Sequence, residues 1–331
     1  MQSLILAVSL LGAPDTTRAP EGALLVVANK QEASLSIIDL ASGKLVGTVP
    51  TGEGPHEVAV TSDGRFAIVA NYGAQAPGNS LTVVDLRARS VARTIDLGDY
   101  RRPHGIVVLP GDSLVTVTSE QSRNAVIVSI TGGVRTAIPT SAQGSHMVAV
   151  TGDGKRGYTA NVGSGSITEL DLEKGMPLRS LPVAVQTEGV GVTPDGREVW
   201  VGSNGAHTVT IIDTRTWKPV DTLSAAGLPY RIAMSPDGRT AVVPAPMAGV
   251  IRVFDVATRK ERAAVSFAGG GGDGAGPVGS TISADSRYAF VALQGTNEAA
   301  MVDLASGKEI TRYATGAGPD GIAVYWPVTK R

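Results

Sequence analysis

The segment HEVAVTSDGRFAIVANYGAQAPGNSLTVVD occupies residues 56–85 and carries the pattern that decides the fold. Two short apolar runs, HEVAV and FAIVAN, flank an Asp-Gly pair, and a third run, LTVVD, ends in an aspartate. Asp-Gly between apolar runs is the strongest short hairpin signal, because a type I′ turn needs positive φ at both central positions. The segment therefore predicts consecutive antiparallel strands joined by tight turns.

The same pattern recurs along the whole chain. The runs that end in this aspartate, or once in serine, are SLSIID to Asp39, LTVVD to Asp85, AVIVS to Ser129, SITELD to Asp171, TVTIID to Asp213, IRVFD to Asp255 and AAMVD to Asp303. The turn recurs as TSDGR at 61, TGDGK at 151, TPDGR at 193, SPDGR at 235 and SADSR at 283. A period of about 42 to 48 residues, made only of short strands, is typical of propeller blades and not of helical solenoids.

We therefore predict an all-β, seven-bladed β-propeller with four-stranded antiparallel blades. The chain starts with a second-strand segment at 24–29 and ends with a first-strand segment at 321–326. The C-terminal strand is thus expected to close the first blade and remove the open edge of the ring. The aspartates that end the third strands are expected to accept backbone N–H bonds in the following turns. We expect residues 23–331 to form a single propeller and residues 1–22 to be a signal peptide or an N-terminal tail.

Composition excludes several function classes. The chain has 29 basic and 30 acidic residues and a net charge of -1, so no global field favours nucleic acid. It contains no cysteine, which rules out disulfides, thiolate metal sites and cysteine nucleophiles. We expect a monomer that does not bind nucleic acid and has no integral membrane segment.

The N-terminal segment has two interpretations. Ser3 to Ala13 is an apolar run with the length of a signal-peptide core, but no Lys or Arg precedes it. It is too short to span a bilayer. One interpretation is an export signal that lacks its basic start, and the other is an apolar tail packed on the propeller. The first is favoured and predicts a periplasmic or secreted protein.

The repeats resemble a known family. VVANK, FAIVANYG and YTANVGSGSITELDLEKG, together with the PDGR turns and the GPH and GPD segments, are similar to the YVTN β-propeller repeat, over residues 24–326. That family includes surface-antigen-like propellers and is distantly similar to lactonases such as 6-phosphogluconolactonase. The resemblance implies the propeller fold and, more weakly, lactone hydrolysis. This chain departs from the lactonases in its shorter, more regular repeats.

Alignment of the repeats identifies one register just before the first strand of each blade. The innermost strands of a propeller line its central channel, so this register is expected to open on one face. Its residues, here called the mouth positions, are His56, His104, His146, Glu188, Tyr230, Val278 and Asp320. Three of the four histidines of the chain occupy these seven positions. The second strands end at the same face, which adds Glu120 as a candidate, and Arg231 follows Tyr230.

Metal binding is one interpretation of this ring. His56, His104, His146 and Glu188 offer imidazole and carboxylate ligands that suit one divalent transition metal, Zn²⁺, Fe²⁺ or Cu²⁺. Glu120 is an alternative oxygen ligand. The ligands come from separate strands and match no local metal motif, so the site depends on the predicted register.

A metal-free hydrolase is the second interpretation. His104 or His146 would act as general base, Glu120 or Glu188 as acid or orienting group, and Arg231 as an anchor for an oxyanion or carboxylate. The third interpretation is a scaffold whose top face binds a small molecule, peptide or protein partner without catalysis. A local explanation also exists, since proline fixes φ before each strand and a polar residue there satisfies backbone groups.

Overall fold

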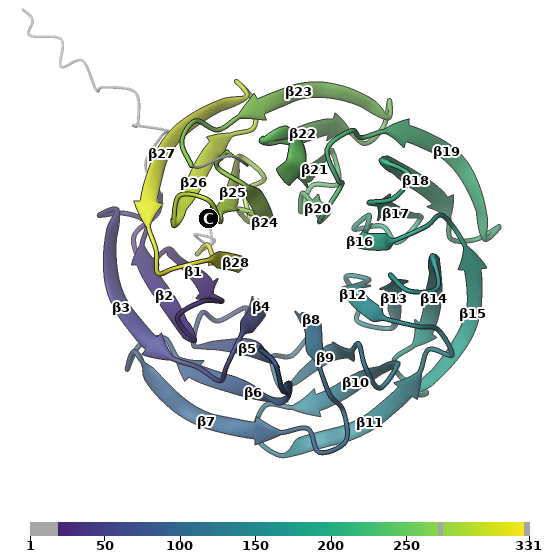
Figure 1. Ribbon diagram of the computed structural model, residues 1–331, viewed down its shortest axis with the longest axis horizontal. Helices are drawn as coiled ribbons and strands as arrows, with labels where there is room; N and C mark the ends of the chain where they lie inside the picture. Colours follow the sequence, from purple (N-terminus) through teal and green to yellow (C-terminus); the bar gives the residue numbers. More distant parts are fainter. Residues whose placement is uncertain (1–18, 271–273, 328–331) are drawn as a thin grey trace, which may run out of the picture.

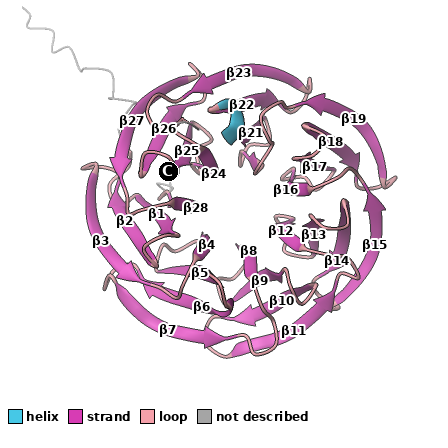
Figure 2. Cartoon of the chain, in the orientation of Figure 1, coloured by secondary structure: helices cyan, strands magenta, loops and turns pink. Residues whose placement is uncertain are grey.

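The computed structural model describes residues 19–270 and 274–327 and shows seven four-stranded sheets arranged in a ring (Figure 1). This confirms the predicted all-β seven-bladed propeller. The apolar run from Ser3 to Ala13 lies outside the described residues. Across the part of the chain that the structure describes, the only helical segment is one 3₁₀ turn, η1 (Pro246–Ala248), drawn in cyan in Figure 2. No helix there is long and apolar enough to cross a membrane.

Each blade contributes one strand to each of four concentric positions (Figure 1). The innermost strands are β28 (Pro319–Tyr325), β4 (Pro55–Val60), β8 (Pro103–Val108), β12 (Ser145–Val150), β16 (Thr187–Val192), β20 (Ala233–Met234) and β24 (Pro277–Ile282). The second strands are β1 (Leu24–Asn29), β5 (Phe66–Gly73), β9 (Leu114–Ser119), β13 (Arg156–Asn161), β17 (Glu198–Ser203), β21 (Thr240–Ala245) and β25 (Tyr288–Leu293). The third strands are β2 (Ser34–Asp39), β6 (Pro77–Asp85), β10 (Asn124–Ser129), β14 (Ser166–Asp171), β18 (Thr208–Asp213), β22 (Val250–Asp255) and β26 (Glu298–Asp303). The outermost strands are β3 (Lys44–Pro50), β7 (Ser90–Asp96), β11 (Gly133–Pro139), β15 (Met176–Pro182), β19 (Lys218–Ser224), β23 (Lys260–Ser266) and β27 (Lys308–Ala314).

The ring closes as predicted. β28 pairs antiparallel with β1, with Leu24 opposite Tyr325, so the two ends of the described chain share the first blade. Ile322 is buried in a cluster with Leu25 and Phe290, which belongs to the seventh blade. The closing strand is therefore hydrogen-bonded within the first blade and joins it to the last blade through apolar packing.

The tight turns occur where predicted but have a different geometry. Gly64 has φ of 67°, whereas Asp63 is not among the residues with positive φ. Gly64 N–H donates to Thr61 O at 2.9 Å, and Thr61 N–H donates to Phe66 O at 2.9 Å. The expected type I′ turn is therefore wrong, and the connection is a type I turn followed by a left-handed glycine. The Asp63 carboxylate explains the preference, because it accepts the Thr61 hydroxyl at 2.6 Å and the Arg65 N–H at 2.9 Å.

The predicted role of the strand-ending aspartates is confirmed. Asp39 Oδ1 accepts the backbone N–H of Ser42 at 2.7 Å, and Asp213 Oδ1 accepts that of Thr216 at 2.6 Å. These bonds hold the turn that leads to the outermost strand. The repeated aspartate is thus a structural residue and not part of a site.

The inner strands of adjacent blades approach each other closely. A side chain on Gly321 would clash with the His56 carbonyl of the next blade, and one on Gly279 would clash with the Asp320 carbonyl. A Cβ on Gly105 would lie 2.7 Å from Val148 N. Glycine at these positions lets the inner strands converge, and this convergence brings the mouth positions together.

Candidate functional site

The mouth positions share one place in the fold. Each is the second residue of an innermost strand, except Tyr230, which precedes the short β20. The structure therefore gathers the predicted residues at one end of the channel. They are His56 in β4, His104 in β8, His146 in β12, Glu188 in β16, Val278 in β24 and Asp320 in β28.

Three imidazole rings pack together across the second, third and fourth blades. The ring centroids of His56 and His104 lie 4.0 Å apart, and those of His104 and His146 lie 3.7 Å apart. His104 is completely buried, and His56 and His146 retain 4% and 9% exposure. Tyr72 covers the cluster edge-on, with its centroid 5.5 Å from that of His104.

His104 occupies the centre of this cluster with no conventional partner. Neither Nδ1 nor Nε2 has a hydrogen-bond partner among the described residues, although both atoms are buried. Burial and the nearby cationic groups hold the pKa of His104 well below its ordinary value, so the ring is neutral. An unsatisfied buried polar group costs roughly 1–3 kcal/mol. His104 therefore carries two buried ring nitrogens whose hydrogen-bonding capacity is unused within the described residues.

His146 lies between two carboxylates. Its Nδ1 is 3.2 Å from Glu120 Oε2, and its Nε2 is 2.7 Å from Glu188 Oε1. Burial disfavours the charged imidazolium, but the hydrogen bonds to Glu120 and Glu188 outweigh it and raise the pKa of His146. Glu120 also accepts the Tyr72 hydroxyl at 3.0 Å. The ring is fixed from both sides.

Arg231 points into the mouth, although strand alternation could have turned it away. Its Nε donates to Glu57 Oε1 at 2.8 Å, and its Nη1 donates to Glu188 Oε1 at 3.2 Å. Arg231, Glu57 and Glu188 are all buried. Our sequence analysis did not identify Glu57, yet a signal existed. It follows a mouth position, where the other blades have Gly105, Met147, Gly189, Arg231, Gly279 and Gly321. Glu57 and Arg231 are the charged residues in that register, and their charges are opposite.

Lys30 is a second residue that the sequence analysis missed. It directly follows β1, and the equivalent residues of the next two blades are Tyr72 and Glu120. Its Nζ lies 2.8 Å from His56 Nε2 and 3.4 Å from Asp320 Oδ2. Asp320 Oδ2 is also 3.3 Å from His56 Nδ1, close enough for an ion pair but without hydrogen-bond alignment, so we treat the contact as weak. Burial raises the pKa of Asp320 to about 6 and lowers that of His56.

Two overlapping groups have side chains placed for metal coordination. Ligand atoms of His104, Glu120 and His146 all lie within 4.8 Å of one another, and so do those of His56, Glu57 and His104. His104 belongs to both groups. Glu188, the predicted carboxylate ligand, belongs to neither group. It contacts Nε2 of His146, whereas Glu120 contacts Nδ1 of the same ring.

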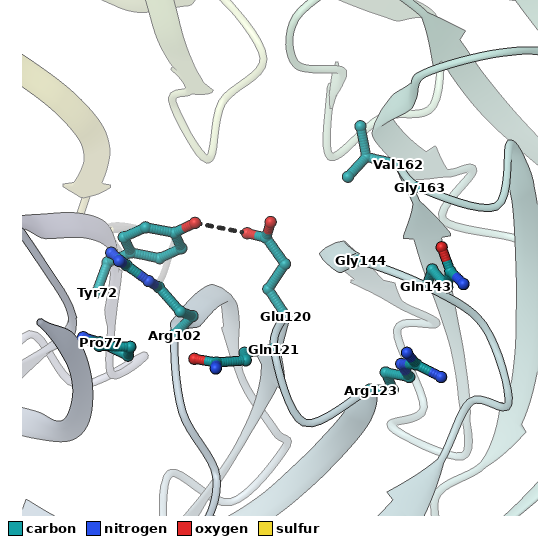
Figure 3. A pocket seen from close by; sticks show the side chains of 10 residues that line it. All are labelled: Tyr72, Pro77, Arg102, Glu120, Gln121, Arg123, Gln143, Gly144, Val162 and Gly163. Carbon is teal, nitrogen blue, oxygen red and sulfur yellow. Dashed lines mark hydrogen bonds between the residues drawn. The ribbon is translucent and has the colours of Figure 1, made fainter. Parts of the chain in front are cut away.

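A pocket of about 510 Å³ adjoins the histidine cluster (Figure 3). Glu120 and Tyr72 line the pocket and also contact the histidine rings, and the dashed line in Figure 3 marks the hydrogen bond between these two side chains. The other lining residues are Pro77, Arg102, Gln121, Arg123, Gln143, Gly144, Val162 and Gly163. The pocket therefore lies beside Tyr72 and Glu120, the two side chains that contact the histidine rings.

Comparisons with known proteins support the fold alone. No protein-family model matches the chain, and no curated protein matches it. Among solved structures, the chain is similar to hydrazine synthase from Kuenenia stuttgartiensis, with 22% sequence identity and a TM-score of 0.74. The match covers 86% of this chain and 94% of that one. At this identity the likeness establishes a shared propeller architecture and leaves function to the site itself.

Proposed function

We propose that this protein is an exported β-propeller that binds one divalent transition metal at the mouth of its channel, through His104, His146 and Glu120. The observation that carries the proposal is the His104 ring, which is completely buried and has two nitrogens without partners among the described residues. A metal ion would use a nitrogen that the protein itself leaves unbonded. The export part of the proposal depends on the apolar run at Ser3 to Ala13.

The separation of the ligand atoms supports this set. Ligands bound at 2.0–2.1 Å in a tetrahedral site lie about 3.4 Å apart. His146 Nδ1 and Glu120 Oε2 are 3.2 Å apart, and His104, Glu120 and His146 each offer one ligand atom that lies within 4.8 Å of those of the other two. Two imidazoles and a carboxylate suit Zn²⁺, Fe²⁺ or Cu²⁺ and leave a coordination position open.

Glu188 has the position of a residue that orients a metal ligand. With Nδ1 of His146 on the metal, the Nε2–H would donate to Glu188 Oε1, which lies 2.7 Å away. Arg231 holds that same carboxylate oxygen at 3.2 Å. Histidine ligands usually donate their second ring N–H to such a carboxylate, which fixes the tautomer and the ring orientation.

The alternative group, His56, Glu57 and His104, is less suitable. The Lys30 ammonium lies 2.8 Å from His56 Nε2, and a cation there would repel a metal ion. Glu57 is already paired with Arg231 at 2.8 Å. Glu120, in contrast, faces the pocket, so a metal beside it could receive an exchangeable ligand.

The test is metal binding by untagged protein. Chelator-treated protein is titrated with Zn²⁺, Fe²⁺ and Cu²⁺, and the bound metal is measured by elemental analysis and calorimetry. We expect one ion per chain for the wild type, and at least tenfold weaker binding for His104→Ala, His104→Gln and Glu120→Gln. His207→Asn is the matched control, because His207 is exposed and asparagine tolerates its left-handed φ of 55°.

Three results would reject the proposal: no stoichiometric metal in the wild type, unchanged affinity in both His104 variants, or equal losses in His207→Asn. Thermal unfolding of each variant checks its folding. Glu120→Gln is informative even if His104 variants are unstable, because Glu120 is only partly buried and lies at the pocket.

A lactonase-like hydrolase is the second candidate, favoured by the position of Glu120 between the pocket and His146. His146 would act as general base for an ester or lactone in the pocket, and Glu120 would orient it. His104 is a weaker candidate for this role, because it has no exposed surface. This candidate predicts that metal-free protein hydrolyses simple lactones, and that Glu120→Gln lowers the rate. Hydrolysis by metal-free protein that is unchanged in Glu120→Gln would contradict the role of Glu120.

A further inference from the structure

The pocket beside Glu120 has a local positive charge that the protein as a whole lacks. Arg102 and Arg123 line it, against the single carboxylate of Glu120, whereas the complete chain has a net charge of -1. Glu120 already pairs with His146 and accepts the Tyr72 hydroxyl. The two guanidinium groups are therefore not neutralised within the pocket.

Arg102 is held in place with donors to spare. Its guanidinium lies 4.6 Å from the Tyr72 ring centroid in a cation–π contact. It donates only two long bonds, at 3.4 Å each, to the carbonyls of Gly73 and Gln75. A guanidinium has five N–H donors in a planar fork that matches carboxylate and phosphate oxygens. Most of its hydrogen-bonding capacity remains available to a ligand.

The backbone at Arg102 follows a conformation that all seven blades share. Two residues before each mouth position, every blade has a left-handed residue, namely Gly54, Arg102, Gly144, Gln186, Leu228, Gly276 and Gly318. Four blades use glycine, for which this conformation has no steric cost. Arg102 has φ of 57°, a conformation that is sterically unfavourable for a residue with a side chain. Three blades retain a side chain at this position, and in the third blade that side chain is an arginine that lines the pocket.

Tyr72 lies between the Arg102 guanidinium and the histidine cluster. Its ring contacts Arg102 on one side, and its hydroxyl donates to Glu120, the metal ligand proposed above. In Figure 3 the side chains of Tyr72 and Arg102 lie together on one side of Glu120, with Arg123 and Gln143 on the other. A ligand in the pocket would thus meet the arginines and the edge of the metal site together.

We infer that this pocket binds a small polar anion of the carboxylate or phosphate type, with Arg102 as its principal contact and Arg123 as a second cation. The inference extends the proposed function, because the bound anion would face the open coordination position beside Glu120. A bidentate guanidinium contact supplies the specificity for an anion over its neutral analogue.

The experiment uses the full-length protein in metal-free and zinc-loaded forms. Isothermal titration calorimetry measures binding of succinate, of its neutral diamide succinamide, and of inorganic phosphate. We expect succinate or phosphate to bind, succinamide not to bind, and Arg102→Gly to weaken anion binding at least tenfold. Comparison of the succinate and phosphate arms identifies the preferred type of anion. Arg123→Gln is expected to have a smaller effect.

Gln186→Gly is the matched control, since Gln186 has the same register and a φ of 54° in the fifth blade. Both glycine variants relieve the same backbone strain, so both are expected to keep the wild-type thermal midpoint to within a few degrees. Anion binding should fall only in Arg102→Gly.

The outcomes separate the two proposals. Metal binding without binding of either anion overturns this inference and leaves the metal site intact. Anion binding by a protein that binds no metal overturns the proposed metal site and leaves the anion pocket intact. Equal anion affinity in Arg102→Gly and the wild type, or an equal loss in Gln186→Gly, would also overturn the role of Arg102.

Discussion

Arg231 Nε donates to Glu57 Oε1 at 2.8 Å, although 174 residues separate them in sequence. Glu57 belongs to β4 in the second blade, and Arg231 precedes β20 in the sixth, so the bond spans the mouth of the ring (Figure 1). Both side chains are buried, and Arg231 also holds Glu188. This ion pair connects distant blades and supports the residue that orients His146.

Arg231→Met is expected to destabilise the protein by about 3–5 kcal/mol, because it leaves the buried carboxylates of Glu57 and Glu188 without their cation. Urea unfolding at neutral pH measures the change. Arg197→Met is the control, since Arg197 pairs with Asp195 at the surface with 84% side-chain exposure. A loss below about 1 kcal/mol in Arg231→Met would show that the buried pair contributes no more than a surface pair.

Glu188→Gln is expected to weaken metal binding by roughly 10–100-fold, the usual effect of losing a carboxylate that orients a histidine ligand. Calorimetric zinc titration measures the affinity. The surface variant Glu173→Gln is the control, since the Glu173 side chain is 60% exposed. Wild-type affinity in Glu188→Gln, with an unchanged fold, would contradict the proposed orientation of His146.

Gly279→Ala is expected to destabilise the ring by about 1–3 kcal/mol, because the added methyl group would clash with the Asp320 carbonyl on the neighbouring inner strand. Gly152→Ala provides the comparison. A Cβ on Gly152 would have its nearest contact at 3.7 Å, with Pro194 O. Thermal unfolding of the pair should therefore differ by several degrees. Equal midpoints would mean that the inner strands can separate without cost.

Acid is expected to destabilise the blade turns. Hydrogen bonds from Ser42 lower the pKa of Asp39, and bonds from Thr216, Thr258 and Ser306 contribute to lower pKa values of Asp213, Asp255 and Asp303. A folded-state pKa below the unfolded value contributes stability above the unfolded pKa of about 3.9, and this stability is lost as the pH falls through the folded pKa. Unfolding free energy should thus decline below about pH 4.

Replacing these four turn aspartates with asparagine tests this explanation. The fourfold variant should be less stable at pH 7 and should lose less stability between pH 5 and pH 3 than the wild type. Asp99→Asn, at an exposed loop position, is the control. Parallel pH profiles for the wild type and the fourfold variant would contradict the assigned cause.

The repeat made much of this structure predictable. A period of strands and turns identifies the blades, and β28 pairs with β1 as expected from the incomplete repeats at the two ends. Alignment in one register also identified His56, His104 and His146, because equivalent positions in a propeller lie at equivalent places around its axis. The turn type was predicted incorrectly, since the local bonds of Asp63 stabilise a different geometry from the one that Asp-Gly most often adopts.

The sequence by itself determined the ring, its closure and the seven mouth positions, because these follow from hydrogen bonding and burial that every repeat shares. Only the tertiary structure decided which side chains meet. The pairing of Glu57 with Arg231, the position of Lys30 beside His56, and the two carboxylates on His146 depend on how far the inner strands converge. Those distances depend on close packing between blades, which strand periodicity does not specify.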